Sequence, residues 1–280
     1  MKIAFIGGGN MAAALIAGLA GKLTPGANIH VVDPNPASLE ALQRQYGVTV
    51  AASVAEGAAL AQAEVLVLAV KPQVMREVAQ QLLPQLQAAQ AAGRAPLVLS
   101  IAAGIRAVDL ARWLGGYQAI VRTMPNTPAL IGMGVTGMVA AAGVSAAQRA
   151  AADQILRAVG ATVWLDDESQ IDAVTAVSGS GPAYVFYFIE ALQQAAQELG
   201  LSAEQGKQLA LATFSGAAQL ALQSPDPVPV LREKVTSKGG TTYAALTSME
   251  ASGVKAAIIA GVKAAAARGK ELGQELGAAG

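Results

Sequence analysis

KIAFIGGGNMAAALIAGLAG, residues 2–21, places an apolar strand, three glycines and an alanine-rich helix in direct succession. Within it, GGGNMA fits G-x-G-x-x-A, with Gly7, Gly9 and Ala12 at the small positions. In that pattern the first glycine makes a tight turn, the second lets backbone approach a pyrophosphate, and the third position lets helix and strand pack. Free N–H groups and the dipole at the helix start favour an anion. The stretch therefore predicts a dinucleotide site; the plainer interpretation is a closely packed turn.

Strands and helices alternate from this stretch to about residue 164. Further strands are expected in NIHVVD, AEVLVLAVKP, APLVLSIAAG, AIVRTMPNTP, GVTGMVAA and ATVWLDD, with helices over 72–92 and 146–159. Apolar strands that alternate with helices indicate an α/β fold with a doubly wound parallel sheet, covered on both faces.

Helical spacing replaces the strand signals after Trp164. Helices are expected over 181–200 and near 202–223, 229–234, 241–251 and 254–273. The chain is therefore divided into a Rossmann-type domain over 1–164 and an all-α domain over 165–280. Long helices rich in Ala and Leu favour burial against a second subunit, so we expect a dimer through this half.

The composition excludes several kinds of site. The chain has no cysteine, which excludes disulfides, thiolate chemistry and cysteine-ligated metals. His30 is the only histidine and is interpreted as structural, so neither a histidine-based triad nor a metal site is expected. With 19 basic and 19 acidic residues and no dense cationic run, binding to nucleic acid is not expected. The absence of a signal-peptide layout and of an apolar run of roughly 18 residues favours a soluble, cytoplasmic protein without membrane contact.

The ends of later strands carry further candidates for dinucleotide contact. Asp33 ends the second strand, where an acid usually binds the ribose 2′-OH and disfavours a 2′-phosphate, so its position favours NAD(H). Asp33 as a cap of the turn is the plainer interpretation. Lys71, in AVKPQ at 69–73, faces phosphate, substrate or solvent. The small residues of SIAAG, at 100–104, leave room for a nicotinamide ring or serve helix–sheet packing.

Three loops remain without an assigned role. MPNTP at 124–128 holds Asn126 between two prolines, as a structural turn or a functional loop. SGSGPAY at 178–184 opens a long helix, as a cap or as a pocket wall. VTSKGGTT at 235–242 sets small hydroxyls and two glycines before a helix. That turn is either a capped loop or a set of N–H groups directed at a small anion.

Taken in order, GGGNMA, AVKPQ, MPNTP, SGSGPAY and VTSKGGTT resemble the pyrroline-5-carboxylate reductase family, over Lys2 to about Arg268. The segment LREKVTSKGGTTYAALTSME carries the most specific part of the likeness. The resemblance implies an oxidoreductase that reduces 1-pyrroline-5-carboxylate to L-proline with NAD(P)H, the last step of proline biosynthesis. It also implies a Rossmann domain, a helical dimerisation and substrate-binding domain, a homodimer, and a decamer of five dimers.

The same resemblance assigns the site residues. It places the cofactor, NADPH or NADH, at the strand ends. Asp33 is added to this set because it ends the second strand. The full set is Ile6, Gly7, Gly8, Gly9, Asn10, Met11, Asp33, Ala69, Val70, Lys71, Pro72, Ser100, Ile101 and Ala102. It places the substrate between this edge and the glycine-threonine loop, usually of the partner subunit: Asn126, Ser237, Gly239, Gly240, Thr241 and Thr242.

Three positions depart from the family's pattern. Lys238 stands where the loop usually has proline, and Glu56 lies where an asparagine is common before the AVKP strand. Asp33 favours NADH, whereas the family often prefers NADPH.

A cyclic imine with a carboxylate suits the residues that are present. N–H groups at the start of the helix at 241 offer a carboxylate seat, and Thr242 Oγ reaches a ring nitrogen. An imine can arrive protonated, so orientation replaces a dedicated acid. Thr242 is therefore the expected catalytic residue, with Lys71 as the alternative for proton transfer.

Two rival functions stay open at the level of sequence. Another NAD(P)-dependent imine or hydroxy-acid reductase with Rossmann and all-α halves would need Lys238 or Lys207 as its proton donor. A non-catalytic dinucleotide sensor on the same fold would bind cofactor without turnover. A substrate panel separates these functions.

Overall fold

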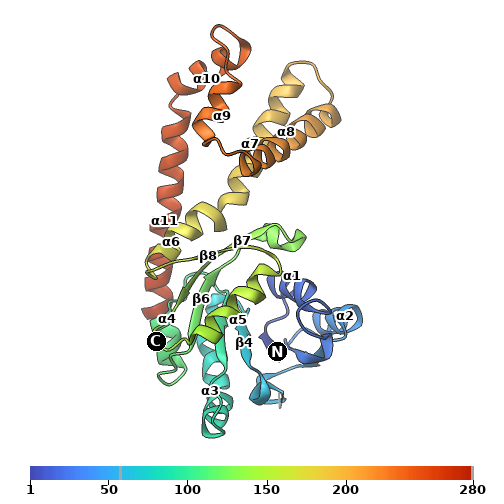
Figure 1. Cartoon of the computed structure of the whole chain (residues 1–280), viewed down its shortest axis with the longest axis vertical. Coiled ribbons are helices and arrows are strands. Elements are labelled where there is room, and N and C mark those ends of the chain that lie inside the picture. The colour runs from blue at the N-terminus through green and yellow to red at the C-terminus, as the bar shows by residue number, and fades with distance from the viewer. Residues whose placement is uncertain (57–58, 279–280) are drawn as a thin grey trace. The chain divides into compact units, whose positions relative to one another are not determined.

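The computed structural model describes residues 1–56 and 59–278 and separates into two compact units (Figure 1). The first unit contains Met1–Ser180 together with the segment from Ala265 onward, and the second contains Gly181–Ala264. Each unit has its own architecture, and the candidate cofactor residues all lie in the first.

An eight-stranded sheet forms the centre of the first unit, in the order β3-β2-β1-β4-β5-β6-β7-β8. Every neighbouring pair is parallel except β6 and β7. The expected doubly wound α/β sheet is therefore confirmed. The strands are β1 Ile3–Ile6, β2 Ile29–Val32, β3 Thr49–Ala51, β4 Val65–Leu68, β5 Leu97–Ser100, β6 Ile120–Met124, β7 Gly134–Ala140 and β8 Gly160–Trp164.

Two features of the sheet escaped the sequence patterns. Strand β3 has only three residues, none of them buried, so it lacks the apolar run that marks the other strands. Strands β6 and β7 are joined by a short turn that contains the 3₁₀ helix η5, Thr127–Ile131. A parallel pair needs a connection of about a dozen residues or more, so this short connection forces an antiparallel pair.

Helices cover both faces of the sheet. Helices α1 (Asn10–Leu19), α2 (Pro36–Tyr46) and α5 (Ala146–Arg157) share one apolar core with Phe5, Val31 and Val67. Helices α3 (Met75–Ala91) and α4 (Ala107–Trp113) share a second core with Ile6 and Leu68 on the other face. The alternation of strand side chains between two buried faces accounts for the continuous apolar strands.

The first unit continues past Trp164, where the sequence pattern placed the domain division. Helix α6, Gln170–Val174, contacts β6 and β7, and a π-helical turn, Thr175–Gly179, follows it. Gly137 leaves room for this packing, because a Cβ there would lie 2.6 Å from Val174. The contacts therefore divide the chain at Ser180.

The end of α11, Val254–Ala278, also belongs to the first unit. Leu276 packs against the core beneath α3 and α4, and the Arg112 guanidinium donates to the Gly277 carbonyl at 2.8 Å. Helix α11 is thus longer than the expected 254–273, and one uninterrupted helix belongs to both units.

The second unit is helical, with α7 Gly181–Glu198, α8 Ala203–Gln223, α9 Val228–Lys234, α10 Thr241–Ala251 and the first part of α11. Helices α7 and α8 pack on each other, with Gly206 of α8 against Ala196 of α7. Helices α9 and α10 contain no buried residue in the single chain. Large apolar side chains are exposed on this unit, among them Phe186, Tyr187, Leu199, Leu209, Leu220, Leu222, Val228 and Met249.

Across residues 1–56 and 59–278, no single helix combines the length and hydropathy of a membrane span. In this described part of the chain, α10 and α11 taken together meet those criteria, and they are bent by 54° with respect to each other.

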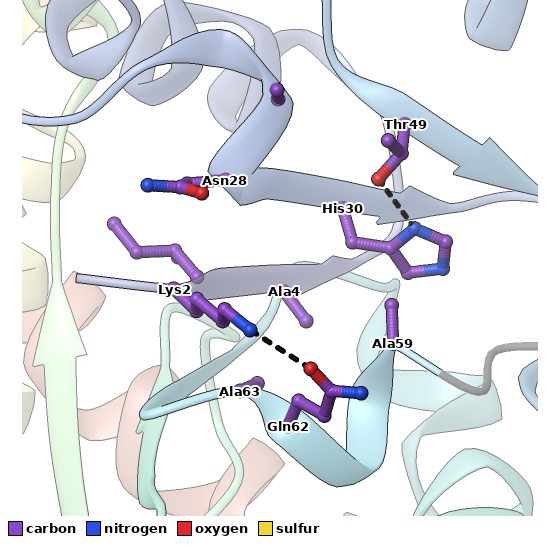
Figure 2. Close-up of a pocket in the computed structure, with 10 residues that line it drawn as sticks. Lys2, Ala4, Asn28, His30, Thr49, Ala59, Gln62 and Ala63 are labelled. Carbon is purple, nitrogen blue, oxygen red and sulfur yellow. Dashed lines mark hydrogen bonds between the residues drawn. The ribbon is translucent and has the colours of Figure 1, made fainter.

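His30 lies on β2 inside a cavity of about 320 Å³, next to the starts of β1 and β2 (Figure 2). Its Nδ1 lies 2.9 Å from Thr49 Oγ1, and only 9% of the residue is exposed. Across the cavity, Lys2 Nζ donates to Gln62 Oε1 at 2.8 Å. The glycine turn follows the opposite ends of the same strands, so His30 lies away from the candidate cofactor residues.

We expect His30 to make the chain less stable below neutral pH. Burial lowers the pKa of His30 from its ordinary value of 6.5. The unfolded chain therefore binds a proton that the folded chain excludes, and stability is lost as the pH falls through 6.5 toward the folded pKa. Between pH 7.5 and 5.5 the Tm should fall more for wild type than for His30→Gln, since no second histidine titrates there. Parallel Tm curves for the two proteins would contradict this role.

Candidate functional site

The glycine turn joins the ends of three strands. Gly7 adopts a φ of +103°, and a Cβ at this position would lie 2.6 Å from the Ala69 carbonyl oxygen after β4. Its N–H donates to the Val32 carbonyl at the end of β2, at 2.8 Å. Only glycine combines this backbone conformation with so close an approach.

Gly9 leaves the start of α1 open. It is the N-cap residue with a φ of −71°. Among the residues that the structure describes, no side chain caps the helix, and nothing lies within 4 Å of a Cβ built on Gly9. The first i→i−4 bond of the helix runs from Ala13 to Gly9 at 2.9 Å, so earlier N–H groups have no such partner in the helix. Open space before unpaired donors and a positive dipole end fits the pyrophosphate of a dinucleotide.

Asp33 braces the same turn with both carboxylate oxygens. Oδ2 accepts from the Gly8 N–H at 2.7 Å, and Oδ1 accepts from the Asn35 N–H at 2.8 Å. The plainer interpretation of Asp33, as a residue that fixes the turn, thus has direct geometric support. Its contact with a ribose hydroxyl stays a prediction.

The other candidate cofactor residues meet at this sheet edge, because β2, β1, β4 and β5 are parallel neighbours. The Ala69 N–H donates to the Ile6 carbonyl at 2.8 Å, and the Ile101 N–H donates to the Leu68 carbonyl at 3.1 Å. Lys71 is exposed and precedes the 3₁₀ turn η4, Pro72–Val74. Ser100 is 1% exposed, and its carbonyl accepts from Thr123 Oγ1 at 2.9 Å.

Asn126 uses both ends of its amide on backbone groups within the first unit. Nδ2 donates to the Ser178 carbonyl at 3.1 Å, and Oδ1 accepts from the Val135 N–H at 2.9 Å. It therefore ties the MPNTP loop to the π-helical turn of SGSGPAY, two motifs that are far apart in sequence. These bonds support the structural-turn interpretation, and substrate binding by Asn126 stays a prediction.

An ion pair between the buried Arg122 and the partly exposed Glu168, beside the candidate nicotinamide loop Ser100–Ala102, was not expected from the sequence. Arg122 on β6 pairs in register with Ser100 on β5, and its side chain is 5% exposed. Arg122 Nη1 lies 2.7 Å from Glu168 Oε1, which also accepts from the Ala107 N–H at 2.7 Å. The signal was a lone arginine in the apolar strand AIVRTM, because a buried charge requires a partner.

The glycine-threonine loop lies in the second unit, whereas the cofactor candidates lie in the first. Gly239 has a φ of +75°, and the Gly240 N–H donates to the Ser237 carbonyl at 3.0 Å. Gly240 is the N-cap of α10, and no described side chain caps this helix either. Thr241 and Thr242 open α10, with Thr242 half-buried, and Lys238 is exposed. In the described part of the chain, no group of three or more His, Cys, Asp or Glu side chains could hold a metal ion.

Comparison with known proteins identifies the family. The family model for "Pyrroline-5-carboxylate reductase dimerisation" matches residues 168–272. The family model for "NADP oxidoreductase coenzyme F420-dependent" matches residues 2–104. The chain is 49% identical to the pyrroline-5-carboxylate reductase of Pseudomonas aeruginosa, over 99% of this chain and 98% of that protein. The chain belongs to the pyrroline-5-carboxylate reductase family. The motif-based assignment is thereby confirmed, together with the oxidoreductase class and the use of NAD(P)H.

Solved structures agree with this assignment. A pyrroline-5-carboxylate reductase from Coxiella burnetii superimposes with a TM-score of 0.89 at 39% identity, over 97% of this chain and 98% of that one. A pyrroline carboxylate reductase from Plasmodium falciparum, solved with NADP bound, gives 0.84 at 29% identity, over 98% of each chain. The family's shared architecture thus extends along the whole chain, and the matched dimerisation region agrees with a homo-oligomer.

Proposed function

We propose that the chain reduces 1-pyrroline-5-carboxylate to L-proline as the last step of proline biosynthesis. The observation that supports this most directly is the 49% identity, over 99% of the chain, to the pyrroline-5-carboxylate reductase of Pseudomonas aeruginosa. The open start of α1 behind Gly9 supports the cofactor part of the proposal. Residues Ile6–Met11 hold the pyrophosphate of NADPH or NADH, and Asp33 keeps the turn in place. When bound, the nicotinamide supplies a hydride to the C=N carbon of the substrate.

The loop from Ser237 to Thr242 seats the substrate carboxylate. Its two glycines admit close approach, and the uncapped N–H groups of α10 and the positive end of the helix attract an anion. Thr242 Oγ orients the ring nitrogen, and each bond to a charged group contributes about 1.5–3 kcal/mol. Asn126 lies in the MPNTP motif, whose loop it braces, and this motif is the reason for placing it near the substrate.

Proton delivery needs no histidine in this scheme. The one histidine, His30, is buried and lies at the opposite ends of the strands from the glycine turn. The substrate binds as a protonated iminium, so the chain's task is to orient two reactants and exclude water. Thr242 assists the transfer of the proton that the ring nitrogen carries, with Lys71 as the alternative.

A side-by-side assay with NADH and NADPH tests the function. The purified protein should oxidise both cofactors in the presence of 1-pyrroline-5-carboxylate and produce proline. The reaction is followed by the decrease in absorbance of the reduced nicotinamide. Other cyclic imines and 2-keto acids serve as the comparison panel. Faster turnover of a keto acid would favour a hydroxy-acid reductase that uses Lys238 or Lys207, and binding without turnover would favour a dinucleotide sensor.

Thr242→Ala should lower kcat/KM for 1-pyrroline-5-carboxylate roughly 10- to 150-fold without abolishing activity, because one orienting bond is lost while proximity remains. Thr242→Ser keeps the hydroxyl and should retain most activity. Thr247→Ala is the matched control, since Thr247 lies on the same helix and its hydroxyl donates to the Tyr243 carbonyl at 2.8 Å. An unchanged kcat/KM in Thr242→Ala would remove Thr242 from the mechanism.

The assembly that we propose is a homodimer through the second unit, with five dimers in a decamer. Exposed apolar side chains on α7, α8 and α10 support a partner of the same kind. Light scattering of the purified protein measures the mass directly, and a monomer at micromolar concentration would contradict the dimer. The cytoplasmic location expected from the sequence stays a prediction.

A further inference from the structure

A cavity of about 220 Å³ in the first unit gathers an unusual number of charges. It lies between β6, the segment before α4, α6 and the end of α11, away from the glycine turn of β1. Three cations and two carboxylates contribute to its wall: Arg106, Arg122, Lys270, Glu168 and Asp172. Three positive charges against two negative charges leave an excess of one positive charge around a small space.

The charges in this cavity are unevenly paired. Arg122 and Glu168 pair at 2.7 Å, although Arg122 Nε is buried and has no hydrogen-bond partner among the described residues. Arg106 and Lys270 make no ion pair within the described residues, and Asp172 makes none there either. With Arg122 and Glu168 paired, the unpaired charges in the wall are the cations Arg106 and Lys270 and the carboxylate Asp172, which together carry one net positive charge.

Packing of α11 holds these two cations near each other. Gly273 lies beside Arg106, since a Cβ at Gly273 would be 3.4 Å from Arg106 Nε. Lys270 precedes Gly273 by three positions on α11, which places the two on neighbouring turns of one helix face. Gly269 lies one turn earlier on α11. A Cβ built on Gly269 would lie 3.7 Å from Asp172 Oδ1 and 3.9 Å from Asp172 Cβ. Helix α11 thus turns its glycines toward this part of the first unit. Because glycine has no side chain, the charged groups of Arg106 and Lys270 contribute to the cavity wall instead.

We propose that this cavity binds a small oxyanion, a phosphate or a carboxylate, between Arg106 and Lys270. Guanidinium groups bind the paired oxygens of such anions, and ammonium groups serve as point charges. Arg106 lies between the candidate nicotinamide loop, Ser100–Ala102, and α4. A bound anion therefore joins the end of α11 to the segment that follows this loop. The proposal does not depend on the reaction assigned above.

Thermal unfolding with added anions tests the proposal. The protein is saturated with NADPH, so that its dinucleotide site is filled, and is titrated with inorganic phosphate, acetate or chloride at equal ionic strength. At ten times the dissociation constant, the specific anion should raise the Tm by about 3–5 °C above the chloride series. A response to phosphate alone indicates a phosphate site, and a response to acetate as well indicates a site for carboxylates.

Matched variants locate the site. Arg106→Gln combined with Lys270→Gln should reduce the anion-dependent shift at least threefold, and Lys270→Gln alone by about half. Lys263→Gln is the control, because Lys263 is exposed on the same helix and lies outside the cavity wall. Lys270 is itself exposed, so its single variant remains informative if the double variant does not fold. The proposal is overturned if phosphate and acetate act no more strongly than chloride, or if the Lys270→Gln shift equals that of wild type.

Discussion

Gly9→Ala is expected to raise the KM for the nicotinamide cofactor roughly 100-fold, about 2.7 kcal/mol, while the Tm stays almost unchanged. The backbone of Gly9 has a φ of −71°, which any residue adopts, and no atom in the described part of the chain lies within 4 Å of the added methyl group. The fold therefore tolerates alanine. The methyl group instead occupies the space before α1 that the pyrophosphate needs.

Gly7→Ala provides the contrast to Gly9→Ala. Its Cβ would meet the Ala69 carbonyl oxygen at 2.6 Å in a backbone conformation of φ +103°, so this variant should lose both stability and cofactor affinity. Steady-state kinetics with NADH and NADPH, together with Tm measurements, separate the two effects. Normal cofactor KM in Gly9→Ala would show that the phosphates bind elsewhere.

Glu168→Ala is expected to lower the free energy of unfolding by about 3 kcal/mol, which corresponds to a Tm lower by about 6–12 °C. The substitution leaves Arg122, whose side chain is 5% exposed, without its carboxylate, and the Ala107 N–H without its acceptor. A buried charge that has lost its partner costs far more than a surface pair contributes.

Two variants separate the charge from the hydrogen bonds. Glu168→Gln keeps an acceptor but removes the negative charge, so it should be less stable than wild type and more stable than Glu168→Ala. Glu271→Ala is the surface control, since Glu271 pairs with Arg268 at 3.0 Å with both side chains exposed, and it should cost less than about 1 kcal/mol. Equal losses in Glu168→Ala and Glu271→Ala would mean that Arg122 finds another partner.

Much of the fold could be predicted because local pattern and tertiary role agree. Apolar runs such as Val65–Leu68 are buried on both faces, and the helix of α8 begins at a capping box formed by Ser202 and Gln205. Strand β3 could not be found, because it is stabilised by pairing with β2 rather than by an apolar run of its own. The extent of the first unit was equally hidden, since it depends on contacts of α6 and α11 that are distant in sequence.

The candidate site divides along the same line. The glycine turn was readable because its geometry follows from residues next to each other in the chain. The pair of Arg122 with Glu168 was not, because its partners lie on separate elements and no local spacing connects them. The brace that Asn126 makes to Ser178 is of the same long-range kind. Geometry within one turn is encoded locally, whereas side-chain partners across the fold are not.

The helix shared by both units also sets an order on folding during synthesis. Residues 265–278 complete the packing of the sheet-bearing unit, yet the ribosome makes them after the entire second unit. The nascent sheet must therefore wait, without the contacts that Leu276 and Gly277 make beside α4, until α7 to α11 have been translated.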